Sequence, residues 1–158
     1  MENITSFTGE NKFYSNFYPV IVNVEGLNFP TVEHAYQACK TKEFFFRKLM
    51  SQLPADKAGL ARKRGQTIIR RTDWPIVKID TMHDLLCQKF NQEPFKTKLM
   101  KTIDAHIEEG NFWHDNEWGN CKCEKCKSVE GQNWMGRLLD DIRSQLIAKG
   151  NCYRRYTQ

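Results

Sequence analysis

Residues 30–40 read Pro-Thr-Val-Glu-His-Ala-Tyr-Gln-Ala-Cys-Lys, and this segment combines a helix start signal with a helical repeat of apolar residues. Pro30 is followed by Thr31, a residue type that accepts hydrogen bonds from the first free N–H groups of a helix. Apolar residues then recur at i, i+3, i+4 and i+7, from Val32 to Cys39. This spacing predicts a helix that starts near Thr31 and buries one stripe of side chains.

The same helix carries polar residues along one line. Glu33 and Lys40 are seven residues apart, so they lie within about 20° of each other, and Gln37 is close to the same line. A rise of 1.5 Å per residue separates their Cα atoms by roughly 10 Å, which is too far for a simple salt bridge. The helix dipole favours an ionised carboxylate at Glu33, in the first turn.

This pair of side chains suits the cleavage of a glycosidic bond. The transition state resembles an oxocarbenium ion, which a carboxylate can stabilise or attack through an activated water. A lysine can bind phosphate, or attack C1 of an opened sugar when its amine is neutral. Spacing alone also fits any helix with a Glu at its start and a Lys near its end, so a structural role for Glu33 and Lys40 stays open.

The segments around this helix predict the fold class. Val20–Val24 and Leu27–Phe29 are rich in strand-forming residues and flank Glu25-Gly26, which predicts a hairpin with a two-residue turn. Apolar spacing predicts further helices over residues 44–53, 80–90, 95–107 and 133–147, and residues 55–71 as a helix that continues into a loop. We therefore expect an α+β fold, a mostly helical single domain with a small antiparallel sheet near the N-terminus.

Length and charge limit the class of protein. The chain has 158 residues, of which 40% are hydrophobic, which fits one domain over residues 1–149 with a basic tail over 150–158. No apolar run approaches the ~18 residues of a membrane span, and no signal peptide pattern opens the sequence, so we expect a cytoplasmic protein that does not bind membranes. The net charge of +5 suits an anionic partner, although an incidental positive charge remains an alternative.

A cysteine cluster near the C-terminal third has spacing typical of metal sites. Cys121, Cys123 and Cys126 lie within six residues, and His114 is the nearest candidate for a fourth ligand. Structural zinc sites use four Cys or His ligands, so these residues form a candidate structural zinc site. Three reduced thiols without metal are the alternative.

Eight short motifs occur in a fixed order along the chain. They are Ser15-Asn16-Phe17, the Glu25-Gly26 turn, Pro30-Thr31-Val32-Glu33-His34 with Gln37 and Lys40, Trp74 after a basic stretch, Lys89-Phe90, Asp115-Asn116-Glu117-Trp118-Gly119, Gly131-Gln132-Asn133-Trp134-Met135-Gly136, and Ile142-Arg143. In this order and spacing, over roughly residues 5–147, the sequence resembles the NADAR (YbiA-like) family. The cysteine cluster departs from the family pattern, which has a Gly-rich stretch at that place.

The resemblance implies hydrolysis of an N-glycosidic bond to ribose without a catalytic cofactor. Two substrate classes are associated with the family: ADP-ribose attached to guanine in DNA or a nucleoside, and phosphoribosylamino-pyrimidine intermediates of riboflavin synthesis. We expect the first, with the second as an alternative. A non-catalytic module that binds NAD, ADP-ribose or nucleic acid is a third hypothesis. The expected partner is therefore ADP-ribosylated guanine in nucleic acid or a phosphoribosyl small molecule.

The resemblance also implies which residues form the site. The expected catalytic residues are Glu33, Lys40 and Asp115. The expected substrate-binding residues are Asn16, Phe17, Gln37, Trp74, Trp118, Gly119 and Asn133. A purely structural role is the alternative for these residues. Trp74 and Trp118 could be core residues, Asp115 could cap a turn, and Asn133 could be the N-cap of the last helix.

Overall fold

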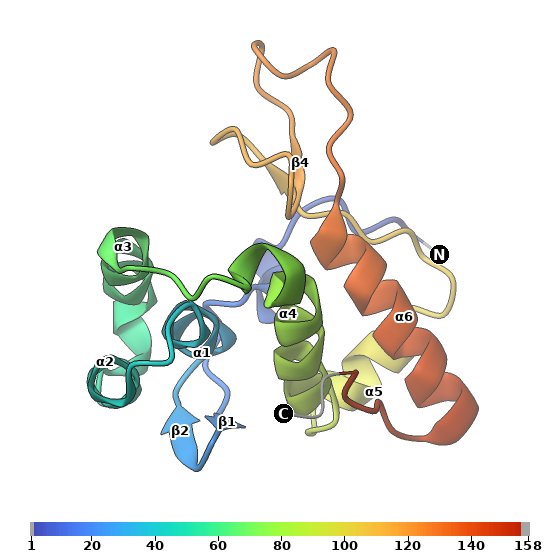
Figure 1. The fold of residues 1–158 in the computed structure, drawn as a ribbon. Coiled ribbons are helices and arrows are strands. Elements are labelled where there is room, and N and C mark those ends of the chain that lie inside the picture. Colours follow the sequence, from blue (N-terminus) through green and yellow to red (C-terminus); the bar gives the residue numbers. More distant parts are fainter. Residues whose placement is uncertain (1, 156–158) are drawn as a thin grey trace. The chain divides into compact units, whose positions relative to one another are not determined.

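A computed structural model describes residues 2–155 of the chain. Helices predominate and a small antiparallel hairpin lies near the N-terminus, which confirms the α+β class (Figure 1). The chain divides into two compact units, one of residues 1–15 with 93–152 and one of residues 16–92 with 153–158. The end of the basic tail predicted over residues 150–158 lies outside the described residues. Within residues 2–155, no helix is long and apolar enough to cross a membrane.

The hairpin belongs to the unit of residues 16–92 and forms as predicted. Strand β1 (Val22–Val24) pairs antiparallel with β2 (Leu27–Phe29), with the first residue of β1 opposite the last of β2. Glu25 and Gly26 both have a left-handed backbone, with φ of 48° and 83°. This is the requirement of the tight turn that matches strand twist, and glycine meets it without steric cost.

Helix α1 (Val32–Cys39) begins where the sequence predicts, because the Thr31 side chain accepts a hydrogen bond of 3.1 Å from the His34 N–H. All eight residues of α1 are buried, and not only the predicted stripe. The reason is that α1 contacts helices on several sides as well as the hairpin (Figure 1). These helices are α2 (Phe44–Ser51), α3 (Ala58–Thr67) and α4 (Trp74–Phe90).

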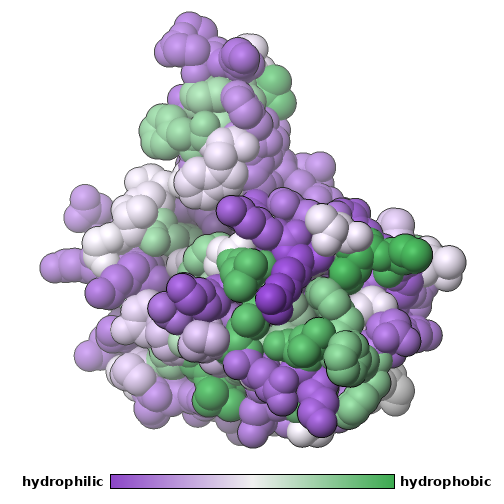
Figure 2. All heavy atoms as spheres, turned by 90° about the vertical axis from the view of Figure 1, so that its left-hand side faces the viewer, coloured by the Kyte–Doolittle hydropathy of each residue, from purple (hydrophilic) through white to green (hydrophobic). Residues whose placement is uncertain are grey.

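The bounds of these helices correct some of the predictions. Helix α3 follows the short 3-10 helix η2 (Ala55–Lys57) and gives way to a loop, as predicted for residues 55–71. Helix α4 begins at Trp74, six residues before the predicted start, with Pro75 in its first turn. A proline is tolerated there because the first N–H groups of a helix have no intrahelical partner. Figure 2 faces α2 and α3 and shows mainly hydrophilic side chains with hydrophobic ones between them.

The unit of residues 1–15 and 93–152 contains the remaining elements. They are the 3-10 helix η1 (Gly9–Tyr14), α5 (Phe95–Met100), α6 (Trp134–Lys149), and the short parallel pair β3 (Gly110–Asn111) and β4 (Asn120–Cys121). Helix α6 buries Leu139, Ile142 and Leu146, which confirms the predicted amphipathic helix. Helix α5 ends seven residues earlier than predicted, and Ile103 just beyond it has a left-handed backbone with φ of 47°.

Candidate functional site

Glu33 lies in the first turn of α1 and is 7% exposed. Its Oε1 accepts a hydrogen bond of 2.7 Å from Gln37 Nε2, one turn further along the helix. Its backbone N–H donates to the Asn16 carbonyl at 3.0 Å, which places the Asn16 segment at the start of α1. The helix, one side chain and one backbone contact therefore hold this carboxyl group in place.

Burial raises the pKa of Glu33 above its ordinary value. The hydrogen bond from Gln37 and the charges of Arg62 and Lys40 act in the opposite direction, but desolvation is the larger effect. The helix dipole favours the ionised carboxylate, as predicted, and burial acts against it. A carboxyl group that exchanges its proton at higher pH is suited to general acid or base catalysis.

Gln37 connects α1 to α3. Its Oε1 is buried and, among the described residues, has no hydrogen-bond partner. The backbone of α3 comes close to this side chain at Gly65, where an added Cβ would overlap it. Gly65 therefore permits the Gln37 position that holds Glu33. The sequence analysis did not identify Gly65, because nothing local distinguishes it from any other helical glycine.

Lys40 is the C-terminal cap residue of α1 and is 7% exposed. Its Nζ stands 5.5 Å from the centre of the Tyr36 ring, and within the described part of the chain it forms no ion pair with Glu33. Burial, with the charges of Arg70 and Arg62, lowers the pKa of Lys40 to about 8, while Glu33 acts in the opposite direction. Lys40 is thus still mainly a cation at neutral pH, with a fraction of neutral amine.

Two arginines of the basic run over residues 62–71, the stretch before Trp74, act on this pair. Arg62 lies on α3 and its charge lowers the pKa of both Glu33 and Lys40, and Arg70 lies in the loop after α3 and acts on Lys40. Both arginines are exposed. The sequence analysis did not place either one among the site residues. Together with Lys40 they concentrate positive charge beside a buried carboxyl group, an arrangement suited to a phosphorylated substrate.

Two aromatic rings of the same unit, those of Tyr36 and Trp74, lie near Lys40. Trp74, the first residue of α4, is 3% exposed, and its ring lies 5.1 Å from that of Tyr36 at an interplanar angle of 56°. This contact makes Trp74 part of the core, and a stacking role for it stays a prediction. Phe17 is 41% exposed, and Asn16 Nδ2 donates to Met82 Sδ at 3.6 Å.

In the other unit, Asn111 organises the loop that carries the Asp115–Gly119 motif. Asn111 is 1% exposed, and its Nδ2 donates to the Asp115 carbonyl at 2.7 Å. Its Oδ1 accepts from the N–H groups of Trp113 and Asp115, both at 3.3 Å. The sequence analysis did not identify Asn111, because a lone Asn is a common loop residue.

Asp115 caps the turn that follows. Its Oδ1 accepts from the N–H groups of Glu117 at 3.1 Å and Trp118 at 2.8 Å. Asn133 N–H donates to the Gly119 carbonyl at 3.2 Å, which ties the end of this turn to the start of α6. The turn-capping alternative for Asp115 is therefore real, and a substrate contact for it stays a prediction.

Asn133 does not cap α6 with its side chain. Its Nδ2 donates to the Ile107 carbonyl at 2.9 Å, and its Oδ1 accepts from the Glu109 N–H at 3.1 Å. Its backbone is left-handed, with φ of 49°. Asn133 is the N-cap residue of α6 by position, as the alternative expected, but its side chain makes no cap hydrogen bond and instead bridges two backbone groups of the segment before β3.

The predicted site residues thus fall into two groups. Residues 16–92 bring together Asn16, Glu33, Gln37 and Lys40, with Trp74 beside Tyr36 and Phe17 next to Asn16 in the chain. Residues 93–152 bring together Asp115, Trp118, Gly119 and Asn133.

The structure defines a mainly helical α+β protein with a buried carboxyl group and a buried amine on its first α-helix. The chain belongs to the NADAR domain family, which matches residues 5–147. N-glycosidase YbiA of Escherichia coli is 30% identical over 140 residues, which cover 84% of this chain and 80% of that protein. The NMR structure of the E. coli protein YbiA is similar to this structure, with a TM-score of 0.78 and 26% sequence identity. The match covers 99% of this chain and 94% of the YbiA chain.

Two further relatives are larger proteins. The riboflavin biosynthesis protein PYRR of Zea mays and the riboflavin biosynthesis protein VVA0006 of Vibrio vulnificus are each 30% identical to the chain, over 85% of its length. The matched region covers 23% of the maize protein and 35% of the Vibrio protein. The chain therefore spans about a quarter to a third of these relatives.

Proposed function

We propose that the chain hydrolyses an N-glycosidic bond to ribose, with Glu33 and Lys40 as catalytic residues. The observation that carries the proposal is the buried Glu33 carboxyl group, which Gln37 holds at 2.7 Å and which lies in the field of Lys40 and Arg62. Relatives of 30% identity named N-glycosidase support the reaction class. The intact carboxyl–amine pair argues against a module that only binds ligand.

In this reaction the C1–N bond breaks and a C1–O bond to water forms. Positive charge develops on the sugar ring in the transition state, and an ionised Glu33 stabilises it and takes the proton of the attacking water. The departing base takes up the electron pair of the C1–N bond and then a proton. Lys40 binds phosphate as a cation. In the alternative covalent route its neutral amine forms a bond to C1 of the opened ribose as the C1–N bond to the base breaks, and water then hydrolyses the imine and returns the free amine.

The proposed substrate is ADP-ribose attached to guanine, in DNA or in a nucleoside. A diphosphate offers two anionic groups, and the exposed Arg62 and Arg70 with the buried Lys40 offer three cations for them. The net charge of +5 favours a polyanion such as DNA in the same way. We assign substrate contacts to Asn16, Phe17 and Trp74 of the same unit as part of this proposal. Substrate contacts by Asp115, Trp118, Gly119 and Asn133 stay predictions from the family resemblance.

A second candidate is a phosphoribosylamino-pyrimidine intermediate of riboflavin synthesis. The names of the maize and Vibrio relatives favour it. It has the same kind of C–N bond and one phosphate, for which Lys40 with one arginine is sufficient.

The test uses the purified chain with each substrate separately. We would incubate it with an oligonucleotide that carries ADP-ribosylated guanine and measure released ADP-ribose, and with the pyrimidine intermediate and measure released ribose 5-phosphate. We expect release of ADP-ribose by the wild type and a loss of ~10²-fold or more in Glu33→Gln. The exposed Glu43, which lies just before α2 in the same unit, provides the matched control Glu43→Gln with unchanged activity.

The outcomes separate the hypotheses. Release of ribose 5-phosphate alone selects the riboflavin intermediate. Binding of ADP-ribose by wild type and Glu33→Gln alike, with turnover of neither substrate, would show a binding module and overturn the proposal.

A further inference from the structure

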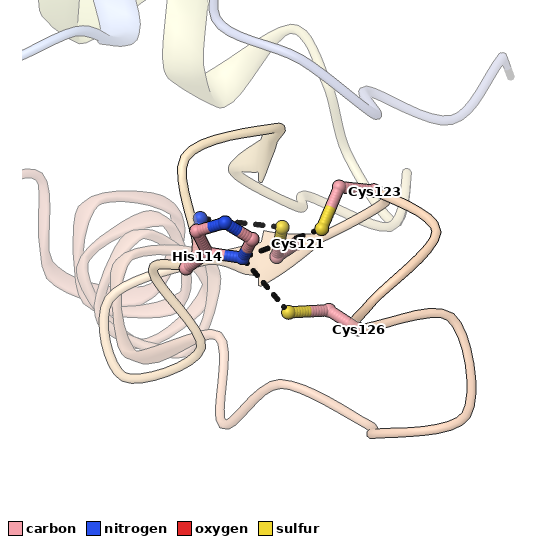
Figure 3. Close-up of side chains that lie close together, drawn as sticks. All are labelled: His114, Cys121, Cys123 and Cys126. Carbon is pink, nitrogen blue, oxygen red and sulfur yellow. Dashed lines mark hydrogen bonds between the residues drawn. The ribbon is translucent and has the colours of Figure 1, made fainter.

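Four side chains converge in the segment between β3 and α6, in the unit of residues 93–152, and one of them belongs to the last residue of β4. They are His114, Cys121, Cys123 and Cys126, and one ligand atom from each lies within 4.8 Å of all the others. Figure 3 shows the three sulfur atoms around the imidazole ring. His114 Nδ1 stands 3.3 Å from Cys123 Sγ and 3.4 Å from Cys126 Sγ.

These distances match those between the ligands of one tetrahedral ion. With Zn–S of about 2.3 Å and Zn–N of about 2.0 Å, tetrahedral angles hold sulfur and nitrogen roughly 3.5 Å apart. The three cysteines of the cluster are free thiols, so each sulfur is available as a ligand. Three thiolates and one imidazole nitrogen form a complete zinc ligand set of soft and borderline donors.

The backbone conformation and hydrogen bonds around the cluster orient these four side chains toward one another. His114 has a left-handed backbone with φ of 67°, an uncommon state for a residue with a side chain. Its N–H donates to Cys121 Sγ at 3.3 Å, the kind of backbone contact that supports a thiolate ligand. The Cys126 N–H donates to the Cys123 carbonyl at 3.0 Å, so a tight turn brings the last two thiols to the same place.

We propose that His114, Cys121, Cys123 and Cys126 bind one structural zinc ion. All four positions of the ion are taken by protein ligands, which leaves none for substrate or water, so the site is structural rather than catalytic.

The ion also has a specific structural task. His114 and Cys121 flank residues 115–120, so the metal closes a ring of the chain around the turn capped by Asp115. Loss of the metal frees both ends of this ring. The amide N–H groups of Glu117 and Trp118, which donate to Asp115 Oδ1, should then lose their protection.

The first test is metal content, which requires no substrate. The chain would be purified without chelator or histidine tag and analysed by mass spectrometry of its metals, with an expected content of about one zinc per chain. Cys123→Ser and His114→Ala should each reduce bound zinc by more than fivefold under the same dialysis. The matched controls are Cys39→Ala, a thiol in the other unit, and His106→Ala, an exposed histidine in the same unit, and both should keep zinc.

The second test measures the coordination of the metal by cobalt absorption and the stability of the turn by hydrogen exchange. Cobalt(II) bound in place of zinc should give the intense visible absorption of a tetrahedral thiolate site, and His114→Ala should alter it. Hydrogen exchange at Glu117 and Trp118 should speed up when a chelator removes the metal, with no change in α1.

Several results would overturn the proposal. They are a chain without metal whose three thiols stay reduced or form a disulfide, zinc content that the ligand variants do not change, and an octahedral cobalt spectrum. None of these depends on turnover, so a failure here is distinct from a failure of the proposed reaction.

Discussion

Helix α1 and the loop of residues 111–126 hold their polar side chains in different ways. In α1, the helical backbone sets the positions of Glu33, Gln37 and Lys40, and all eight residues of the helix are buried among neighbours from the same unit. The loop has only two-residue strands, and side chains such as Asn111 and Asp115 satisfy its backbone. Regular structure therefore positions one group of residues, while individual side chains and the proposed metal position the other.

The two groups of residues should therefore respond differently to substitution. A substitution on α1 that keeps its packing changes chemistry and leaves the fold in place, because the backbone hydrogen bonds remain. A substitution at Asn111 or Asp115 removes hydrogen bonds to several backbone groups at once.

Loss of the Lys40 amine should have the largest effect on activity. We expect Lys40→Met to lower kcat/KM by ~10²-fold or more. The substitution removes a buried cation that would stabilise the negative charge of the substrate phosphate or of the departing base. The unfolding midpoint should change little, since the aliphatic side chain still fills the site. Steady-state kinetics with thermal unfolding of the same samples measure both.

The pH profile separates the two roles of Lys40. Its pKa of about 8 is lower than that of an ordinary lysine, so the cation is lost as pH rises through this value. A phosphate-binding role predicts that kcat/KM falls above pH 8. A covalent role predicts that it rises toward pH 8 and that borohydride traps an adduct at Lys40. We expect the fall and no adduct, and Lys40→Met should flatten this limb of the profile.

Asn111→Ala should be the most destabilising single change in the loop. It removes three hydrogen bonds to backbone groups from a residue that is 1% exposed, with an expected cost of about 2–3 kcal/mol in the free energy of unfolding. Urea denaturation measures it. Asn151→Ala, at an exposed position beyond α6, should cost less than ~0.5 kcal/mol. Equal costs for the two variants would contradict the role given to Asn111.

Gly65→Ala tests the support of Glu33 by Gln37. An added Cβ overlaps the Gln37 side chain, so we expect a cost of about 1–2 kcal/mol despite the better helix propensity of alanine. The activity should fall by ~10-fold as Glu33 loses its partner. Gly59→Ala in the same helix meets no atom and should instead stabilise the chain by up to ~1 kcal/mol.

The double variant Gly65→Ala with Gln37→Ala provides a further check. Gln37→Ala removes the Oε1 and Cδ atoms that the added Cβ would overlap but keeps the Gln37 Cβ at 2.9 Å, so the stability cost of Gly65→Ala should decrease in this background without vanishing. An undiminished cost would place the clash elsewhere.

Asp115 should show the smallest effect on stability. Asp115→Ala removes the cap of a turn and should cost ~1 kcal/mol, whereas Asp115→Asn keeps an oxygen that accepts from Trp118 and should cost less than ~0.5 kcal/mol. Thermal unfolding of the two variants tests the order. If Asn destabilises as much as Ala, the charge and not the cap holds the turn.

The sequence predicted well those features that depend on neighbours in the chain. Thr31 as a helix cap and Glu25-Gly26 as a turn follow from local backbone chemistry, and both are confirmed. The common face of Glu33 and Gln37 follows from helical geometry alone and is confirmed by their hydrogen bond.

What the sequence did not predict depends on contacts between distant segments. The raised pKa of Glu33 results from burial by other elements, which no local pattern encodes. Gly65 matters only because α3 lies against Gln37. Arg62 belonged to a visible basic run, but the run did not indicate which of its residues acts on Glu33 and Lys40.

One backbone contact at the end of α1 has a mechanical consequence. The Arg71 N–H donates to the Lys40 carbonyl at 2.7 Å, and the Arg71 side chain also donates to the carboxylate of Asp73, the residue before α4, at 2.6 and 2.7 Å. The segment from Arg70 to Asp73 therefore connects the end of α1, at Lys40, to the start of α4. Arg70 is one peptide bond from the amide that holds the Lys40 carbonyl, so under the proposed function a phosphate bound at Arg70 would also fix the backbone at Lys40.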